Sequence, residues 1–315
     1  MINSLEDISK LLAGTELEDS SKVELHIPES TKRAFAIKVK PENRFNAWRL
    51  LRALLDETER YPVLAGVGFF ASDTWAEKII GEHMFSRQEF QCESECFNEG
   101  SSSPEAIIER SKTVDVNQRL EQQRQTGYML SLDEKINIEL NYTFARFGIA
   151  PARETIPTFP SDQTNAILGF EKWLFAWELE HLAREVALAP PDLWYLDLDW
   201  YEPPGKIDHT LILLPTLHSW ETLAYLHWFG AASSSTMIAL LKLWHKRFKA
   251  ELVAHDGLML LFDVHQRPST PEEAFQLAVE QGTFAGSTLY LPGISVREHA
   301  RALLHIDRWC LLDKP

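Results

Sequence analysis

Cysteine is scarce in this sequence, with three residues among 315, and the odd number excludes a disulfide framework. Long apolar runs are also missing: the longest, residues 61–71, falls far short of the roughly 20 residues of a membrane-spanning helix. The first residues show neither the basic segment nor the apolar core of a signal peptide. We therefore expect a cytoplasmic protein.

Positively charged residues are also few: the sequence has 31 lysines and arginines and 46 acidic residues, which gives a net charge of −15. A chain this acidic repels phosphate backbones and anionic lipids, so we expect neither a nucleic-acid partner nor a membrane partner. The hydrophobic content of 45% excludes global disorder. These shortages favour a globular protein whose partner is another protein, most naturally a basic one.

The N-terminal region, residues 1–158, shows the pattern of a β-α-β unit. Residues 33–39 alternate as a strand, an amphipathic helix follows from Pro41 to Arg60, and residues 61–67 form an apolar strand. This order predicts a parallel crossover. A second strand is expected at residues 22–27, before the unit.

A helix closed by Gly148 is expected at residues 132–147. A long connecting helix, capped by Ser161-Asp162 and with Ile167, Phe170 and Leu174 on its inward stripe, is expected with a strand in residues 159–205. An α+β domain is expected in residues 206–315. In that domain, strands at 250–255 and 258–265 flank Asp256-Gly257, a strong signal for a two-residue hairpin turn. This turn would place Val253 opposite Leu260 and Leu252 opposite Leu261. We expect the hairpin to be central and packed by helices, one of them spanning residues 295–309, in a protein of mixed α/β class.

Three stretches of the C-terminal region carry a resemblance: Trp220–Leu226, Leu241–Val253 and Pro268–Gln281. They contain a Trp-His pair that closes a helix, an Ala-Glu-Leu-Val strand after it, a hairpin, and a helix that ends in Leu-Ala-x-Glu-Gln. The pattern resembles domain-of-unknown-function family 4253 and covers roughly residues 206–310. Residues 60–63 and 85–87 also resemble longer, bacterial members. The resemblance implies a fold and no activity.

Several positions depart from the pattern of that family. Leu258 and Leu261 stand where the resemblance implies acidic residues, and Ala285 and Ser287 stand where it implies a cysteine and an acid. The segment Ala231–Ser235 replaces an expected tryptophan, cysteine and prolines. A fold kept while its polar positions become apolar or inert favours binding over catalysis.

The best catalytic candidates from the resemblance are His245, Glu251 and Glu280. A buried histidine reached by a carboxylate can act as a general base. The same residues can instead form a structural network, with the histidine closing a helix C-terminus and the glutamate fixing the hairpin. We favour the structural interpretation and keep the catalytic one open.

Residues 194–201 alternate as a strand with two aspartates, Asp197 and Asp199, on one face. Carboxylates about 6.6 Å apart along a strand could hold a divalent cation or a sugar, act as an acid/base pair, or protect a sheet edge. Aromatic anchors within an acidic rim are also typical of a surface that captures a basic partner. The candidate binding residues are Trp194, Tyr195, Asp197, Asp199, Trp200, Tyr201, Trp220 and Trp244.

A dinucleotide fingerprint is the main cofactor hypothesis: Gly66 and Gly68 begin a Gly-x-Gly-x-x-Ala stretch after a predicted strand. However, Phe69 and Phe70 would crowd the phosphates, so a glycine-relieved strand end is favoured. Two metal hypotheses, Cys92 and Cys96 with His83 and the Glu178-x-x-His181 pair, lack the ligands of a complete site. We expect no cofactor and no metal.

The working hypothesis is a non-enzymatic binding protein with an acidic face for a basic protein. An immunity-like protein directed at a basic toxin is one form of it, by analogy with bacterial immunity-type domains. The alternative is a hydrolase-like or metal-assisted enzyme that uses Asp197 and Asp199, or His245 and Glu251. The sequence leaves the oligomeric state open.

Overall fold

The computed structural model describes residues 2–67, 74–76, 78–79, 103–124, 130–160, 162–193, 196, 208–226, 228, 230 and 232–313. The chain forms two compact units. Unit 1 comprises Met1–Val116, Trp194–Arg267 and Asp307–Pro315, and unit 2 comprises Asn117–Leu193 and Pro268–Ile306. These units differ from the three consecutive segments expected from the sequence, because strands distant along the chain join one sheet.

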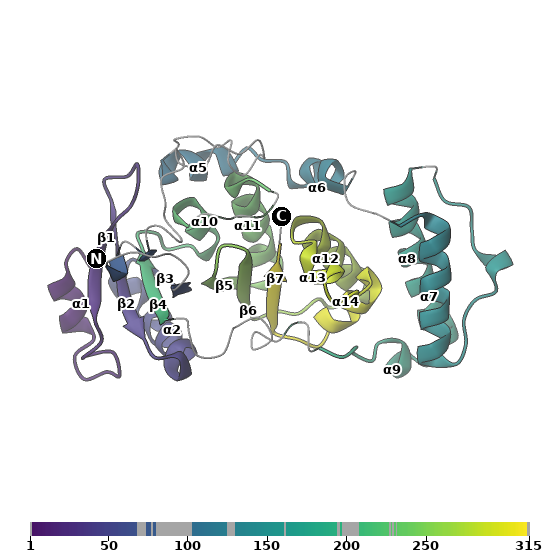
Figure 1. Ribbon diagram of the computed structural model, residues 1–315, viewed down its shortest axis with the longest axis horizontal. Helices are drawn as coiled ribbons and strands as arrows, with labels where there is room; N and C mark the ends of the chain where they lie inside the picture. Colours follow the sequence, from purple (N-terminus) through teal and green to yellow (C-terminus); the bar gives the residue numbers. More distant parts are fainter. Residues whose placement is uncertain are drawn as a thin grey trace. The chain divides into compact units, whose positions relative to one another are not determined.

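Unit 1 is built on a seven-stranded mixed sheet of order β1-β2-β4-β3-β5-β6-β7 (Figure 1). Its strands are β1 (Lys22–His26), β2 (Arg33–Val39), β3 (Tyr61–Val67), β4 (Asp208–Leu214), β5 (Ala250–His255), β6 (Met259–Val264) and β7 (Arg308–Leu312). Only β3 and β5 pair in parallel; the other neighbours are antiparallel. The mixed α/β class is confirmed, and the N-terminal and C-terminal parts of the chain share this sheet.

The two strands of the predicted β-α-β unit run parallel, as predicted, but they are not adjacent in the sheet. Strands β2 and β3 are both antiparallel to β4, so they run in the same direction, and β4 lies between them. This is the split form of a β-α-β unit. Residues 209–214 of β4 are all buried, as expected of a central strand covered on both faces.

Helices cover both faces of the sheet. On one face, α2 (Arg44–Ala53) buries Trp48 and Leu51 against Phe35 of β2 and Leu213 of β4. On the other face, α11 (Ser234–Phe248) places Trp244 edge-on against Trp309 of β7, 5.8 Å between ring centroids. Figure 1 draws α2 and α11 on opposite sides of the strands. The remaining helices in the described residues of unit 1 are α1 (Leu5–Leu11), η1 (Pro41–Asn43), α3 (Leu55–Thr58), α5 (Pro104–Ser111), η5 (Ser219–Glu221) and α10 (Thr222–Tyr225).

The predicted hairpin exists, but its register is wrong. Leu252 pairs with Phe262 and His255 with Leu260, and the register shifts between Leu252 and Ala254, which marks a bulge at Val253. The turn is displaced by one residue: the N–H of Asp256 donates to the carbonyl of Met259 across 3.0 Å, so Gly257 and Leu258 are its two central residues in place of Asp256 and Gly257. Both faces of these strands are apolar and buried, so the hydrophobic pattern does not fix the register.

The last predicted helix is also corrected. Helix α14 spans only Val296–Leu303, and Arg308–Leu312 forms β7, an outer strand of the sheet paired with β6. Four buried residues, 309–312, make up most of that strand. A short apolar run of this kind does not distinguish a buried strand from a buried helix by periodicity.

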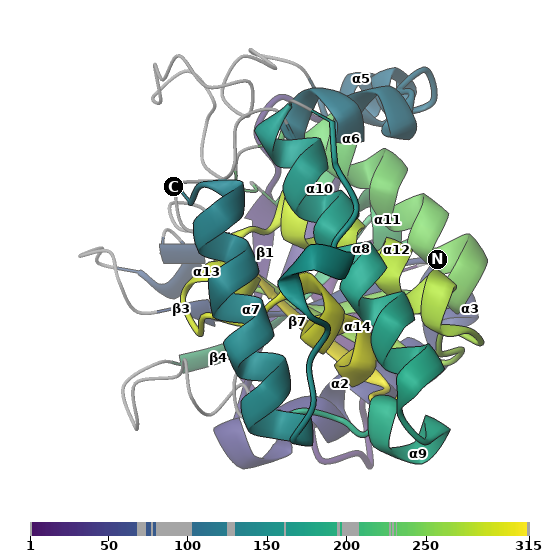
Figure 2. The same cartoon turned by 90° about the vertical axis from the view of Figure 1, so that its right-hand side faces the viewer.

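Unit 2 is helical in the residues that the structure describes (Figure 2). The long connecting helix is confirmed as α8, with Asp162 as its N-cap as predicted. The helix predicted at 132–147 is α7, which begins with a capping box between Ser131 and Glu134 and ends at Gly148, whose φ is +74°. The elements are α6 (Val116–Arg124, whose first residue belongs to unit 1), α7 (Leu132–Phe147), η2 (Arg153–Thr155), α8 (Gln163–His181), α9 (Arg184–Ala187), α12 (Pro271–Phe284), α13 (Ser287–Tyr290) and α14. None of the helices in the described ranges has the length and apolarity needed to cross a membrane.

Candidate binding site

Glu251, a predicted catalytic residue, lies on the α2 face of the sheet and is held by an arginine. Its two carboxylate oxygens accept hydrogen bonds from Arg52 of α2, at 2.7 Å from Nε and 2.6 Å from Nη2. This bond is the main reason why the pKa of Arg52 is raised. A carboxylate engaged on both oxygens by a guanidinium is fixed in position and is not free to take up a proton from a substrate.

The ring of Tyr61 lies close to the ion pair of Arg52 and Glu251. Its hydroxyl donates to the carbonyl of Leu252 across 2.9 Å, and its ring lies 5.9 Å from the Arg52 guanidinium carbon. Burial, and then the nearby Glu251 carboxylate, raise the pKa of Tyr61 well above its ordinary value. The phenol therefore stays protonated and supports β5 as a hydrogen-bond donor.

His245 belongs to the opposite face of the sheet, at the end of α11. Its Nδ1 lies 3.1 Å from the carbonyl oxygen of Ala250, and its ring lies 4.6 Å from the ring of Trp220. His218 stacks on the same tryptophan, with centroids 4.4 Å apart and planes 10° from parallel. We name His218, Trp220 and His245 the aromatic stack; His218 is exposed and the other two are half-buried.

Two of the three catalytic candidates, Glu251 and His245, lie on opposite faces of the sheet of unit 1, and the third, Glu280, lies in unit 2. Glu251 points to the α2 side, His245 extends from the helix on the other side, and Glu280 belongs to α12 of unit 2, where its Oε1 accepts a hydrogen bond from Gln276 across 3.1 Å. Trp244, predicted to bind a partner, has no exposed surface and packs in the core. Trp220 is therefore the member of the predicted binding set that the structure places at the surface of unit 1.

The other six predicted binding residues lie outside the described residues, and their role stays a prediction: Trp194, Tyr195, Asp197, Asp199, Trp200 and Tyr201. The enzyme hypothesis that uses Asp197 and Asp199 likewise stays a prediction. Gly68 and the cysteines at 92 and 96 also fall outside the described ranges.

Gly66, the first glycine of the fingerprint, lies within β3, opposite His209 of β4, and its N–H donates to Oδ1 of Asp256 across 2.5 Å. In a dinucleotide site the second glycine is the one that lets the backbone approach the pyrophosphate. That glycine, Gly68, lies outside the described residues, so the structure does not test the dinucleotide hypothesis.

Unit 2 contains a buried charge network that was not predicted from the sequence. Glu178 of α8 has no exposed surface and bonds Arg297 and Arg301 of α14; its Oε1 lies 3.2 Å from Nε of Arg297. Arg297 also bonds Glu139 of α7 and Glu171 of α8, with 3.3 Å to the latter. Four acids and four bases balance in the charge network: Glu139, Glu171, Glu178 and Glu298 with Lys135, Arg146, Arg297 and Arg301.

The pKa shifts follow from burial and these partners. Burial alone would raise the pKa of Glu139, but Arg297 and Lys135 lower it overall. Glu171, which is fully buried, keeps a raised pKa because burial and the neighbouring Glu139 outweigh its bases. The network therefore uses Glu178, half of the predicted Glu178-x-x-His181 metal pair, as a partner of two arginines.

Metal ligands do not gather in the described part of the chain, where no group of three His, Cys, Asp or Glu side chains could hold an ion. The side chain of Cys310 is buried in β7.

A groove of about 320 Å³ runs between α8 and α12 within unit 2. Apolar side chains, among them Leu168, Phe175 and Phe275, line most of it, and Lys172 and Glu272 are its exposed charged residues. Such a groove can take an apolar segment but offers no converging acid and base.

Comparison with known proteins gives one match. The family described as domain of unknown function (DUF4253) matches residues 210–313, so the C-terminal part of the chain carries a domain of this family. The match begins within β4 and ends just after β7, close to the range expected from the resemblance. Neither the curated proteins nor the solved structures contain a match to this chain.

Proposed function

We propose that this chain, whose C-terminal part is a DUF4253 domain, is a binding protein rather than an enzyme and that an acidic face of it takes a basic protein. The observation that carries this proposal is the engagement of Glu251 by Arg52, 2.6 and 2.7 Å away, on the sheet face opposite to His245. The residues that could have formed an acid–base pair instead stabilise β5. An immunity-like protein that neutralises a basic toxin is one form of this function.

Negative charge supports the choice of partner. The net charge is −15, and residues 1–30 alone contain seven acids and two lysines. We name Glu16, Glu18 and Asp19 the acidic segment; their side chains are exposed in the stretch between α1 and β1. Exposed charges of one sign speed the encounter with a basic surface and are screened beyond about 10 Å at 0.1 M salt.

The test compares two variants of equal net charge. One neutralises the acidic segment (Glu16→Gln, Glu18→Gln, Asp19→Asn), and the control neutralises three exposed acids of unit 2 (Glu154→Gln, Glu180→Gln, Glu185→Gln). Each immobilised protein captures partners from a cell extract at about 0.05 M and about 0.5 M salt, where screening differs several-fold in length. The captured proteins are identified by mass spectrometry.

We expect the wild type and the control to retain the same basic protein at low salt and to release it at high salt. The acidic-segment variant should retain much less of it. Equal retention by both variants, or a captured set without any basic protein, would contradict the proposal.

A further inference from the structure

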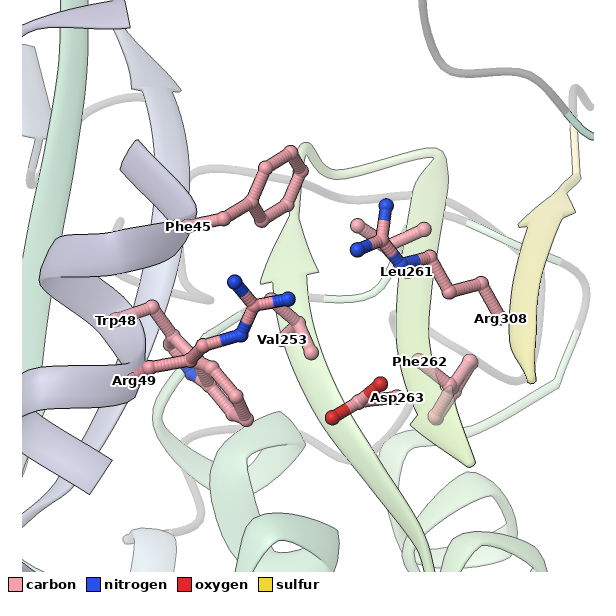
Figure 3. Close-up of a pocket in the computed structure, with 8 residues that line it drawn as sticks. All are labelled: Phe45, Trp48, Arg49, Val253, Leu261, Phe262, Asp263 and Arg308. Atoms are coloured by element: carbon pink, nitrogen blue, oxygen red, sulfur yellow. The ribbon is translucent and has the colours of Figure 1, made fainter. Parts of the chain in front are cut away.

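A hollow on unit 1 lies between α2 and the strands β5, β6 and β7 (Figure 3). Phe45, Trp48 and Arg49 line it from the helix, and Asp263 and Arg308 line it from β6 and β7. Its cavity is only about 10 Å³, which is room for about one water molecule. A ligand would therefore rest on the mouth of the hollow, under the exposed side chains of the two arginines.

The strand register explains why charges meet there. Glu251, Asp263 and Arg308 are Cα partners across β5, β6 and β7, so their side chains form a row on the face that carries α2. Arg52 already neutralises the first of them. The charges that remain at the hollow are Asp263, Arg308 and Arg49, the last of which lies one helical turn before Arg52.

These three charges are not satisfied by one another. The guanidinium of Arg308 lies 5.4 Å over the ring of Phe45, and Arg49 contacts Asn46 Oδ1 at 3.5 Å. Among the residues that the structure describes, neither arginine has an ion pair with a carboxylate. The carboxylate of Asp263 keeps 31% of its side-chain surface exposed, and Nε2 of His265 lies 3.9 Å from its Oδ2.

We propose that this hollow binds a small zwitterion with surplus negative charge, and that an acidic α-amino acid is the simplest such ligand. Two guanidinium groups and one carboxylate give the site a charge of +1, which a ligand with two carboxylates and one ammonium group complements. Arginine binds carboxylates through paired N–H donors, so Arg49 and Arg308 each take one carboxylate while Asp263 takes the ammonium group. Figure 3 shows Arg49 and Arg308 reaching toward each other from α2 and β7, with Asp263 below both of them in the view.

This inference does not rest on the proposed partner, because the hollow is on residues other than the acidic segment. It also differs from a general anion site. An inorganic anion would be attracted by the two arginines and repelled by Asp263, whereas a zwitterion is attracted by all three groups.

The experiment measures binding of L-glutamate to the full chain by calorimetry at low salt. Glutarate, which lacks the ammonium group, is the second probe. The variants are Arg49→Ala, Arg308→Ala and Asp263→Asn, and the control is Lys242→Ala, which removes one exposed positive charge from α11 on the other side of the sheet. Circular dichroism verifies that each variant is folded.

We expect glutamate to bind the wild type and the control equally. Each arginine variant should weaken glutamate binding about tenfold or more, as for loss of a charged hydrogen bond. Asp263→Asn should weaken glutamate and strengthen glutarate. No binding of glutamate to the wild type would overturn the proposal. Equal binding of both probes, unchanged in Asp263→Asn, would also overturn it.

Discussion

Replacement of Arg297 by methionine tests whether the charge network holds unit 2 together. The side chain has no exposed surface and bonds three carboxylates, those of Glu139, Glu171 and Glu178. Methionine keeps much of the volume and removes the charge, which leaves four buried acids against three bases. Removing one partner of a buried ion pair costs about 3–5 kcal/mol, because the remaining charge stays desolvated.

Hydrogen exchange is the suitable assay, because a chain with two compact units need not unfold in one step. A loss of about 3–5 kcal/mol would raise the exchange rates of the most protected amides in α7, α8 and α14 by about 100- to 5,000-fold. Arg153→Met is the control, since Arg153 and its partner Asp133 are 52% and 81% exposed and such pairs contribute about 0–1 kcal/mol.

A second variant separates charge from packing. Adding Glu171→Gln to Arg297→Met restores the balance of three acids and three bases, so part of the lost protection should return. If Arg297→Met changes exchange no more than Arg153→Met, the buried charges do not stabilise unit 2. If the loss of protection in the double variant equals the sum of the losses that the two substitutions cause singly, the loss comes from packing and the electrostatic reasoning is wrong.

Three further predictions concern stability. His299 is fully buried, and burial lowers its pKa from 6.5 to about 3. The unfolded chain therefore takes up this proton below about pH 6.5 while the folded chain does not, so the free energy of unfolding is highest above pH 6.5 and falls as the pH drops towards 3. In urea unfolding, His299→Asn should remove about 2 kcal/mol of the stability loss between pH 6.5 and 5, and an unchanged pH dependence would contradict this. Trp244→Ala should cost about 3–5 kcal/mol, seen as a large drop in Tm, whereas the half-buried Trp220→Ala should cost clearly less. A fragment of residues 206–315 should fail to fold alone, judged by circular dichroism, and a cooperative melting transition would refute this.

Local signals allowed much of the fold to be predicted. Helix α7 was predicted with its observed bounds, because a capping serine at 131 and a glycine at 148 mark its two ends. The strands at 33–39 and 61–67 were also predicted correctly, since each is a short apolar or alternating run. Such signals depend only on neighbouring residues.

The buried charge network could not be predicted, because its partners are distant in sequence. The apolar stripe of α8 was recognised through Ile167, Phe170 and Leu174, which are buried, but Glu171 and Glu178 are equally buried on the same helix. Their spacing of seven residues places both on one helix face, which was the available clue. The bases that neutralise them come from α14, more than 100 residues later. A charged residue on a helix usually indicates a solvated face, and only the partner shows otherwise.

The place of β4 explains why the family match does not delimit a folding domain. The match begins at residue 210, within β4, and also includes β5, β6 and β7. Yet β4 pairs with β2 and β3, and β5 reaches β4 only through β3, so both neighbours of β4 come from the first 67 residues. Without the first 67 residues, β4, whose residues 211–214 are fully buried, would have both edges unpaired and would lose the cover of α2 on one face. The matched segment is therefore completed by the N-terminal strands, and a function of this domain must be sought on the whole sheet.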